Sequence, residues 1–307
     1  MRIKIFVPLL FAIIISCKEK SVETPAKVEE TIKFLPFQQI DLDDLGAFKE
    51  VTENWKVAGS SYVDRSKDRM LSSNEGTGVL VNNPEEGKND NIFTNLEHGD
   101  IELEVDVMMP KGSNSGLYFQ GRYEVQLFDS WGVEAVHHSD MGGIYQRWDS
   151  SKEKGQEGFE GYAPKKNAAK APGLWQNLKI LFHAPKFDTS GRKTGNAIFE
   201  EVWLNGVLIH KNIEVSGPTR AAAFQDEKPK GPLMVQGDHG PVALKNMRYK
   251  TYDDEKVSLG EITMAEYENK SVLLPSFDSI TAVRTVDTDS LSAQMATGER
   301  PQKILKY

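Results

Sequence analysis

Arg122, Glu124 and Gln126 form a short polar row that could take part in binding or proton transfer. They alternate with apolar residues, so an extended strand would place all three side chains on one face. A guanidinium, a carboxylate and an amide in a row can form paired hydrogen bonds with neighbouring hydroxyl groups, such as those of a sugar. The same alternation also suits a solvated outer face, and the spacing alone leaves both interpretations open.

The turn at residues 236–240 holds a second group of candidates. Within it, His239 follows Asp238 and precedes a glycine, and Gln236 lies at its start. A histidine exchanges protons near neutral pH, and an adjacent carboxylate can orient its ring. By itself the turn could equally carry a surface histidine.

Two further polar groups are weaker candidates. Glu102, Glu104 and Asp106 invite comparison with retaining glycosidases, whose two carboxyl groups lie about 5–5.5 Å apart. No aromatic platform accompanies this row, so we expect a solvent-facing strand. The histidine pair at residues 137–138 lacks further ligands at metal-binding spacing and is interpreted as part of a loop.

Alternation with a period of two dominates residues 34–252 and is clearest at residues 101–107. Asn205 and Gly206 separate two apolar runs, which predicts a two-residue β-hairpin. With no long amphipathic helix, this pattern predicts an all-β antiparallel sandwich or barrel. Further strands are predicted at residues 117–119, 123–127, 178–180, 199–204, 233–235 and 242–244.

Residues 147–173 interrupt the strand pattern. This segment is polar, is rich in Lys, Gly and Ala, and is long for a connection between strands. It is either a lid over a site or a disordered excursion. Its aromatic residues Trp148, Phe159 and Tyr162 favour the lid.

Composition excludes several classes of protein. The 307 residues include 37 Lys and Arg, 45 Asp and Glu, and one Cys, for a formal charge of −8. Without a basic stripe, no nucleic-acid partner is expected, because phosphate contacts need clustered cations. A single Cys excludes a disulfide framework and a thiolate zinc site. Calcium could be held by Asp and backbone carbonyls, but no sequence signature supports it.

The N-terminal residues have the pattern of a targeting segment rather than of part of the folded domain. Arg2 and Lys4 precede an apolar run over residues 5–15, too short to cross a membrane, so residues 1–16 are predicted to be a signal peptide. Cys17 follows a small residue, as in the lipobox of bacterial lipoproteins. We expect it to carry a lipid that anchors the protein in the cell envelope, periplasmic or at the cell surface. An ordinary signal peptide with an incidental Cys is the alternative.

The remaining chain divides by composition into three parts. Residues 17–33 read as a solvated tether and residues 34–252 as the β domain. Residues 253–307 form an extension with a short helix expected near residue 265, and they could begin an accessory β module.

Several runs together resemble the 3-keto-disaccharide hydrolase family, which has a concanavalin-A-like jelly roll. The resemblance covers roughly residues 40–252. It implies an all-β fold, a jelly-roll β-sandwich of two antiparallel sheets. The matching runs are residues 114–116, 121–126, 129–130, 143–145, 171–176, 203–206 and 236–240.

The resemblance further implies cleavage of 3-keto-glycosides or 3-keto-disaccharides. The ketone acidifies the C2 proton, a base removes it, and the aglycone leaves by elimination, with or without addition of water. Glu124 and His239 would share the proton transfers, and Arg122 would face the enolate. Asp129 or Asp238 would orient His239, and no cofactor is required. The implied substrate-binding residues are Asn114, Gln126, Tyr145, Trp148, Gln236 and Asp238.

Two other functions remain compatible with the sequence. A conventional retaining glycoside hydrolase on the same fold would use a carboxylate at residue 102 or 104 together with Glu124. A non-catalytic carbohydrate-binding lipoprotein would stack sugar rings on Trp131, Tyr145 and Trp148.

Overall fold

The computed structural model describes residues 31–252 and 260–263. These residues form strands and connecting loops without any helix, so none of them could cross a membrane as a helix. The predicted signal peptide, its Cys17 and the short helix expected near residue 265 lie outside the described residues.

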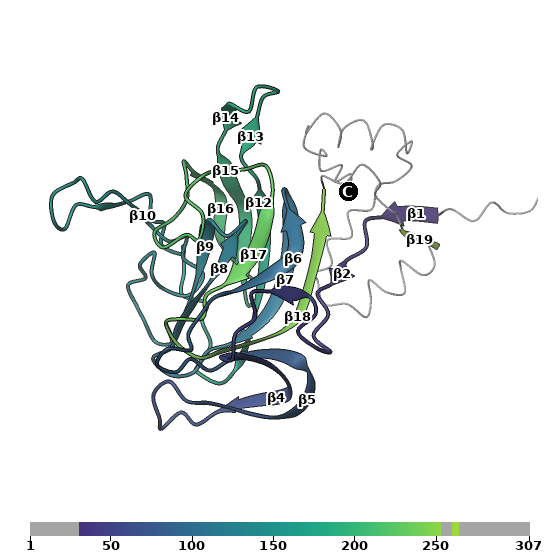
Figure 1. Ribbon diagram of the computed structural model, residues 1–307, viewed down its shortest axis with the longest axis vertical. Coiled ribbons are helices and arrows are strands. Elements are labelled where there is room, and N and C mark those ends of the chain that lie inside the picture. Colours follow the sequence, from purple (N-terminus) through teal and green to yellow (C-terminus); the bar gives the residue numbers. More distant parts are fainter. Residues whose placement is uncertain (1–30, 253–259, 264–307) are drawn as a thin grey trace, which may run out of the picture.

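Two antiparallel sheets, one of eight strands and one of five, build the domain (Figure 1). The chain crosses repeatedly between them, which is typical of a jelly roll and confirms the predicted all-β sandwich. The larger sheet contains, in spatial order, β16 (Val207–Val215), β15 (Ala197–Leu204), β12 (Trp175–His183), β7 (Ile101–Met108), β18 (Val242–Thr251), β5 (Leu71–Asn82) and β4 (Trp55–Val63), with β2 (Gln38–Gln39) paired to β18. The smaller sheet contains β3 (Phe48–Lys49), β6 (Ile92–His98), β17 (Gly231–Val235), β8 (Asn114–Phe119) and β9 (Tyr123–Phe128).

The core lies between the two sheets. Leu103 and Val105 of β7 face it from the larger sheet, and Leu117 of β8 and Val125 of β9 face it from the smaller one, all fully buried. Because side chains on a strand alternate between faces, the residues between these apolar positions must lie on the outer faces of the sheets. The predicted alternation is therefore confirmed, and it decides which residues can form a site.

Three two-stranded ribbons complete the described structure. These are β13 (Lys186–Phe187) with β14 (Lys193–Gly195), β10 (Arg147–Trp148) with β11 (Gly158–Phe159), and β1 (Thr31–Phe34) with β19 (Gly260–Thr263). The last pair joins the end of the predicted tether to the C-terminal extension. The predicted hairpin between β15 and β16 is also present, with positive φ at Asn205 (51°) and Gly206 (81°), as a two-residue turn of this kind requires.

The acidic row of β7 is not solvent-facing, contrary to the sequence prediction. Glu102 and Glu104 are 2% and 7% exposed on the outer face of the larger sheet. Lys179 on β12 lies 2.8 Å from Glu102 Oε1, and Arg248 on β18 donates to Glu104 Oε2 at 2.7 Å. Neighbouring strands thus supply the cations that permit these carboxylates to be buried, which one strand read alone cannot reveal.

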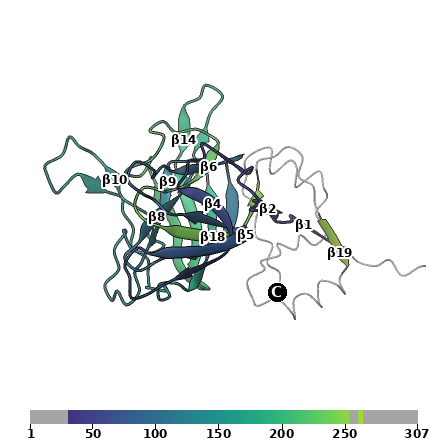
Figure 2. The same ribbon diagram turned by 60° about the horizontal axis from the view of Figure 1, so that its bottom comes forward.

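The segment at residues 147–173 is ordered, and part of it forms the ribbon β10–β11. In both ribbon views this arm extends outward from the sandwich rather than over a sheet face (Figures 1 and 2). Its base is held by Glu160, which accepts hydrogen bonds from the backbone N–H and hydroxyl of Ser216. The disordered-excursion interpretation is therefore wrong, and the lid over a site stays a prediction.

Two buried histidines predict how stability depends on pH. His98 accepts a hydrogen bond from the Gln120 N–H, and His210 lies 3.0 Å from the Gly142 carbonyl. Burial lowers the pKa of each to about 4, below the ordinary 6.5. Between these values the unfolded chain binds more protons, so the free energy of unfolding should fall as pH drops, by about 3 kcal/mol for His98.

Urea unfolding of the wild type and of His98→Asn between pH 7.5 and 4 measures this effect. The variant should be less stable at pH 7.5 and should lose less stability on acidification. Parallel pH dependences for the two proteins would contradict the assignment.

Candidate functional site

A continuous row of side chains crosses the outer face of the smaller sheet. In the strand registers, Phe93 of β6 lies opposite Met234 of β17, Met234 opposite Tyr118 of β8, and Tyr118 opposite Glu124 of β9. Phe93, Tyr118 and Met234 pack together as a small apolar cluster separate from the main core. The row therefore brings Glu124 to the end of an apolar floor.

Glu124 is 2% exposed, and no lysine or arginine among the described residues pairs with it. Burial, opposed by the hydrogen bond from Tyr118 and assisted by the negative charge of Asp238, raises the pKa of Glu124 to about 8. Tyr145 extends the row beyond β9, since its N–H donates to the Glu124 carbonyl at 3.1 Å. Glu124 is thus predominantly protonated at neutral pH and is flanked by two tyrosines.

The next row along the same face contains the predicted polar binders. Gln126 lies opposite Gly116, and its amide donates to Asn114 Oδ1 at 2.9 Å. The N–H of Gln236 donates to the Gly116 carbonyl at 2.9 Å, which carries the row across to β17. Asn114, Gln126 and Gln236 therefore lie beside the Glu124 row. Arg122, Glu124 and Gln126 are all buried, so the alternative that their row is a solvated outer face is wrong.

The loop at residues 236–240 brings Asp238 and His239 to this site. Asp238 Oδ1 lies 2.6 Å from His239 Nδ1, and the Gln236 amide lies 3.2 Å from the same nitrogen. The hydrogen bond with Asp238 raises the pKa of His239. An ionised Asp238 requires the proton on Nδ1, which leaves Nε2 as the nitrogen available to a ligand. The sequence left open whether Asp129 or Asp238 orients His239, and these contacts favour Asp238.

Asp129 lies at a different place. Its carboxylate accepts hydrogen bonds from the N–H groups of Gly112 at 2.9 Å and Trp131 at 3.4 Å. These contacts hold the turn before β8 and the loop after β9. Asp129 therefore positions the chain around Asn114, and its contacts give no support to a direct catalytic role.

A loop at residues 216–230, here called the strap, covers the end of this face. Thr219 fixes it to β9, because its hydroxyl donates to the Arg122 carbonyl and accepts from the Glu124 N–H. The side chain of Arg122 clamps the strap from below, donating to Asp226 Oδ1 at 2.9 Å and to the Asp226 carbonyl. Phe224 of the strap covers the Arg122 guanidinium, with its ring centre 4.9 Å away.

These contacts correct the sequence-based role of Arg122. The Arg122 side chain is 5% exposed, and its guanidinium is already bound to Asp226 and to the Gln120 carbonyl, so it is not free to face an enolate. The strap offers another cation that sequence reasoning missed. Arg220 is exposed, its guanidinium lies 3.9 Å from the ring centre of Trp148, and its charge opposes the rise in the pKa of Tyr145.

Tyr118 was also missed, although a signal for it existed. It alternates with the core residues Leu117 and Phe119, so a hairpin of β8 with β9 had to place it on the same face as Glu124. Arg220 gave no such signal, because loop residues have no periodicity from which their direction could be inferred.

Trp131, Trp148 and the histidine pair at residues 137–138 differ in how they contact the site. Trp148 and Trp131 are 39% and 64% exposed, and only Trp148 is tied to the strap, through Arg220. His138 packs edge-on against Tyr145 at 5.3 Å, so it supports the site rather than serving only as a loop residue. Among the described residues, no group of three or more metal-ligating side chains is present.

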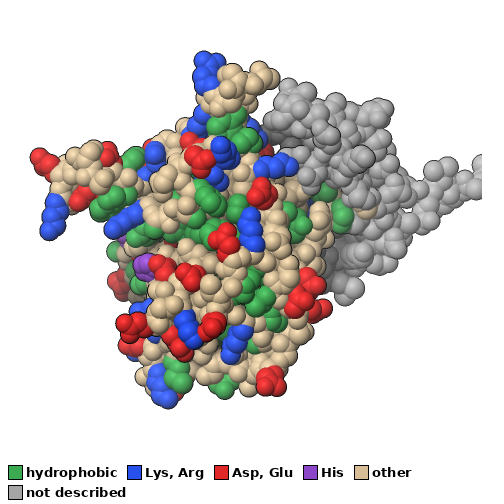
Figure 3. Space-filling view, in the orientation of Figure 1, with side chains coloured by type: hydrophobic (Ala, Val, Ile, Leu, Met, Phe, Trp, Pro, Cys, Tyr) green, Lys and Arg blue, Asp and Glu red, His purple; other side chains and the backbone are tan. Residues whose placement is uncertain are grey.

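Positive and negative side chains are mixed over the face of the molecule seen in Figure 3, and no patch of one charge stands out on that face.

A buried, protonated carboxyl group near an Asp–His pair is an arrangement suited to general acid–base chemistry. A model of the 3-keto-alpha-glucoside-1,2-lyase-like domain matches residues 46–250. The chain belongs to this family, and the resemblance stated from the sequence is confirmed.

Several solved structures resemble this chain at low sequence identity. A candidate glycosyl hydrolase from Parabacteroides distasonis is 20% identical, with 80% of this chain and 100% of that chain covered and a TM-score of 0.46. An alginate lyase from Chlorella virus is 14% identical, with 70% and 100% covered and a TM-score of 0.31. No curated protein matches the chain.

Gly116 provides a test of how tightly the site is packed. A Cβ added there would lie 2.3 Å from Glu124 Oε1 and 2.9 Å from Tyr118 Cε2. Gly116→Ala should therefore destabilise the fold by about 1–3 kcal/mol in urea unfolding. Gly195→Ala is the matched control, because its Cβ would meet Lys186 at an ordinary 3.5 Å. Equal stability of the two variants would contradict this packing.

Proposed function

We propose that this site cleaves the glycosidic bond of 3-keto-glycosides or 3-keto-disaccharides by elimination. The observation that carries the proposal is a proton-bearing Glu124 that feels the charge of Asp238, the same carboxylate that holds His239 by its Nδ1. Elimination needs one group that takes the C2 proton and another that gives a proton to the leaving oxygen. Family membership supports a carbohydrate-cleaving reaction of the hydrolase or lyase type.

The environments of the two groups suggest their roles. His239 Nε2 takes the proton from C2, and the electron pair moves onto the C3 oxygen to form the enolate. The enolate then expels the C1 oxygen, which receives a proton from Glu124. Addition of water to the resulting enone would make the overall reaction a hydrolysis. Two groups with separated proton affinities are what such paired transfers require.

The enolate oxygen needs a partner, and Arg220 is placed to serve. Unlike Arg122, Arg220 is an exposed residue, and its charge acts on Tyr145. A positive charge at this point would favour negative charge that develops during proton removal. Arg122 acts indirectly, because it holds the strap that carries Arg220.

The rival glycosidase mechanism fails on geometry. Glu102 and Glu104 lie on the outer face of the larger sheet, paired with lysine and arginine, while Glu124 lies on the outer face of the smaller sheet. The core of the sandwich therefore separates them, and they cannot flank one glycosidic bond. Lipid attachment at Cys17 and a location in the cell envelope remain predictions from the sequence.

A chromogenic 3-keto-glucoside tests the activity. Purified wild-type protein should release the aglycone, and the unoxidised glucoside should be inert. Glu124→Gln should lower kcat by about a hundredfold or more, because it keeps the shape and removes the transferable proton. Arg220→Gln should lower kcat at least about tenfold, whereas Arg192→Gln, an equal charge change outside the site, should not. Absence of any release by the wild type would refute the proposal.

The pH profile tests the roles of the two proton-transfer groups. Activity should require neutral His239 and protonated Glu124, giving a bell whose alkaline limb lies near the Glu124 pKa of about 8. Asp238 raises the pKa of both groups, so Asp238→Asn should move both limbs of kcat/KM to lower pH. Limbs that stay in place while activity falls would show that Asp238 does not tune this pair.

A further inference from the structure

The tip of the β4–β5 hairpin, residues 64–70, reaches the loop that carries His239. Arg69, near the end of this tip, donates a hydrogen bond from Nη2 to the backbone carbonyl of His239. The two residues are 170 positions apart, so no local pattern in the sequence could predict that they meet. Arg69 is therefore a second charged neighbour of His239, besides Asp238 on its own loop.

The hairpin tip is itself anchored on two other turns. The Arg69 N–H donates to the Lys111 carbonyl at 2.8 Å, and Lys111 Nζ lies 2.7 Å from Asp68 Oδ1. At the start of the tip, Arg65 Nε donates to the Pro172 carbonyl at 2.6 Å. Arg69 has φ = 53°, a left-handed conformation that is uncommon for a residue with a side chain and persists where surrounding contacts hold it. The tip is thus a fixed support from which Arg69 contacts the loop.

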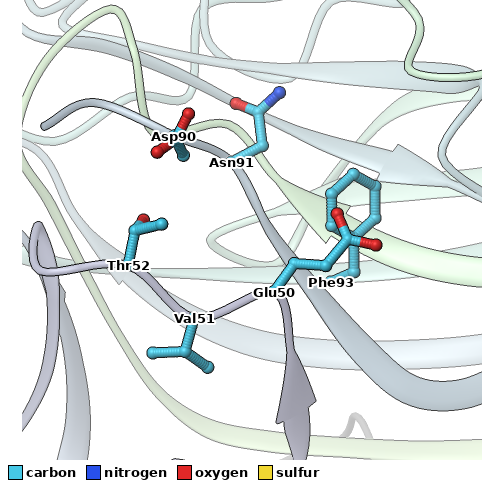
Figure 4. A pocket seen from close by; sticks show the side chains of 6 residues that line it. All are labelled: Glu50, Val51, Thr52, Asp90, Asn91 and Phe93. Carbon is cyan, nitrogen blue, oxygen red and sulfur yellow. The ribbon is translucent and has the colours of Figure 1, made fainter. Parts of the chain in front are cut away.

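The remaining contacts that hold this loop come from uncharged side chains. Asn91 Oδ1 accepts the Gly237 N–H at 2.9 Å, and Asn82 donates to the carbonyls of Gly237 and Gly240, both at 2.9 Å. Asn91 belongs to the wall of a hollow of about 400 Å³ (Figure 4). These contacts fix the backbone of the loop but bring no charge to the ring of His239.

The proton affinity of His239 reflects a balance between two charges. The hydrogen bond with Asp238 raises the pKa of His239, while partial burial and the positive charge of Arg69 lower it. The other titratable groups on neighbouring elements do not shift the pKa of this ring; they are Glu50 and Asp90 of the hollow, Lys111 before β8, Tyr118 of β8 and Glu124 of β9. Among the described residues, Arg69 is therefore the cation that opposes Asp238.

We propose that Arg69 is a positioning residue for the reaction and acts through His239 from a different element than Asp238. The inference rests on the proposed role of His239 as the base that takes the C2 proton. A base must be neutral to accept a proton, and pairing with a carboxylate favours its charged form. The Arg69 guanidinium offsets part of that effect, and its hydrogen bond fixes the residue that carries the ring.

The pH profile of kcat/KM on the chromogenic 3-keto-glucoside tests this role. In Arg69→Gln the acid limb should move to higher pH, while the alkaline limb, set by Glu124, should stay in place. On the acid side of neutral pH the loss should be about tenfold. Arg69→Lys keeps the charge and should keep the acid limb. Arg65→Gln is the matched control: it removes an equal charge and a hydrogen bond to a carbonyl from the same tip, and should change kcat/KM by less than about twofold.

An NMR titration measures the same effect without substrate. The ring signals of His239 are identified by their absence in His239→Asn. The pKa of His239 should be higher in Arg69→Gln than in the wild type and in Arg65→Gln. An unchanged pKa, or an equal change in Arg65→Gln, would overturn the proposal even if activity falls. If the wild type releases no aglycone, the proposed function fails, and this titration still decides whether Arg69 acts on His239.

Discussion

Glu124 is an ionisable group that the fold keeps away from water, and much of the domain is arranged around that fact. Its pKa of about 8 corresponds to roughly 5 kcal/mol against the charged form relative to an ordinary glutamate. Such a group stays in place as a neutral acid only if neighbours close over it and satisfy its oxygens. Tyr118 supplies a hydrogen bond to the carboxyl group, while Tyr145 and Thr219 of the strap hold the Glu124 backbone. The carboxyl group and the Tyr118 ring also fill the space beside Gly116.

The strap explains how an arginine can matter to the site without facing it. Arg122 is buried and shared between Asp226 and the Gln120 carbonyl, while Thr219 ties the strap directly to the Glu124 backbone. A second clamp comes from Glu227, which accepts hydrogen bonds from Tyr123 at 2.6 Å and from Lys193. Two independent attachments of this kind hold a loop that has no regular structure, and so can fix the position of Arg220.

The loop that carries His239 is held in the same manner from the opposite side. Ser113 and Ser115 donate to the carbonyls of Pro241 and Gln236, while Asn82 at the end of β5 and Asn91 just before β6 bind the loop elsewhere. Buried polar groups with their partners in place rigidify what they contact. The Asp–His pair is thus positioned by side chains on both sides of its loop.

The amino-acid sequence by itself determined about half of the sandwich strands, the hairpin at Asn205 and Gly206, and which residues share a face with Glu124, because period-two alternation is a local property of each strand. It gave no such signal for β4, β5 and β6. Alternation alone places both Glu102 and Glu124 on an outer face of a sheet and does not predict that their charge states differ. Only the tertiary structure separated them: Lys250 and Lys179 lower the pKa of buried Glu102, whereas burial without such partners raises that of Glu124. It also turned Arg122 toward the strap and brought Arg220 to the site. The charges around a buried group and the direction of a loop depend on residues that are distant in sequence. Local residue spacing cannot predict which of these distant residues come into contact.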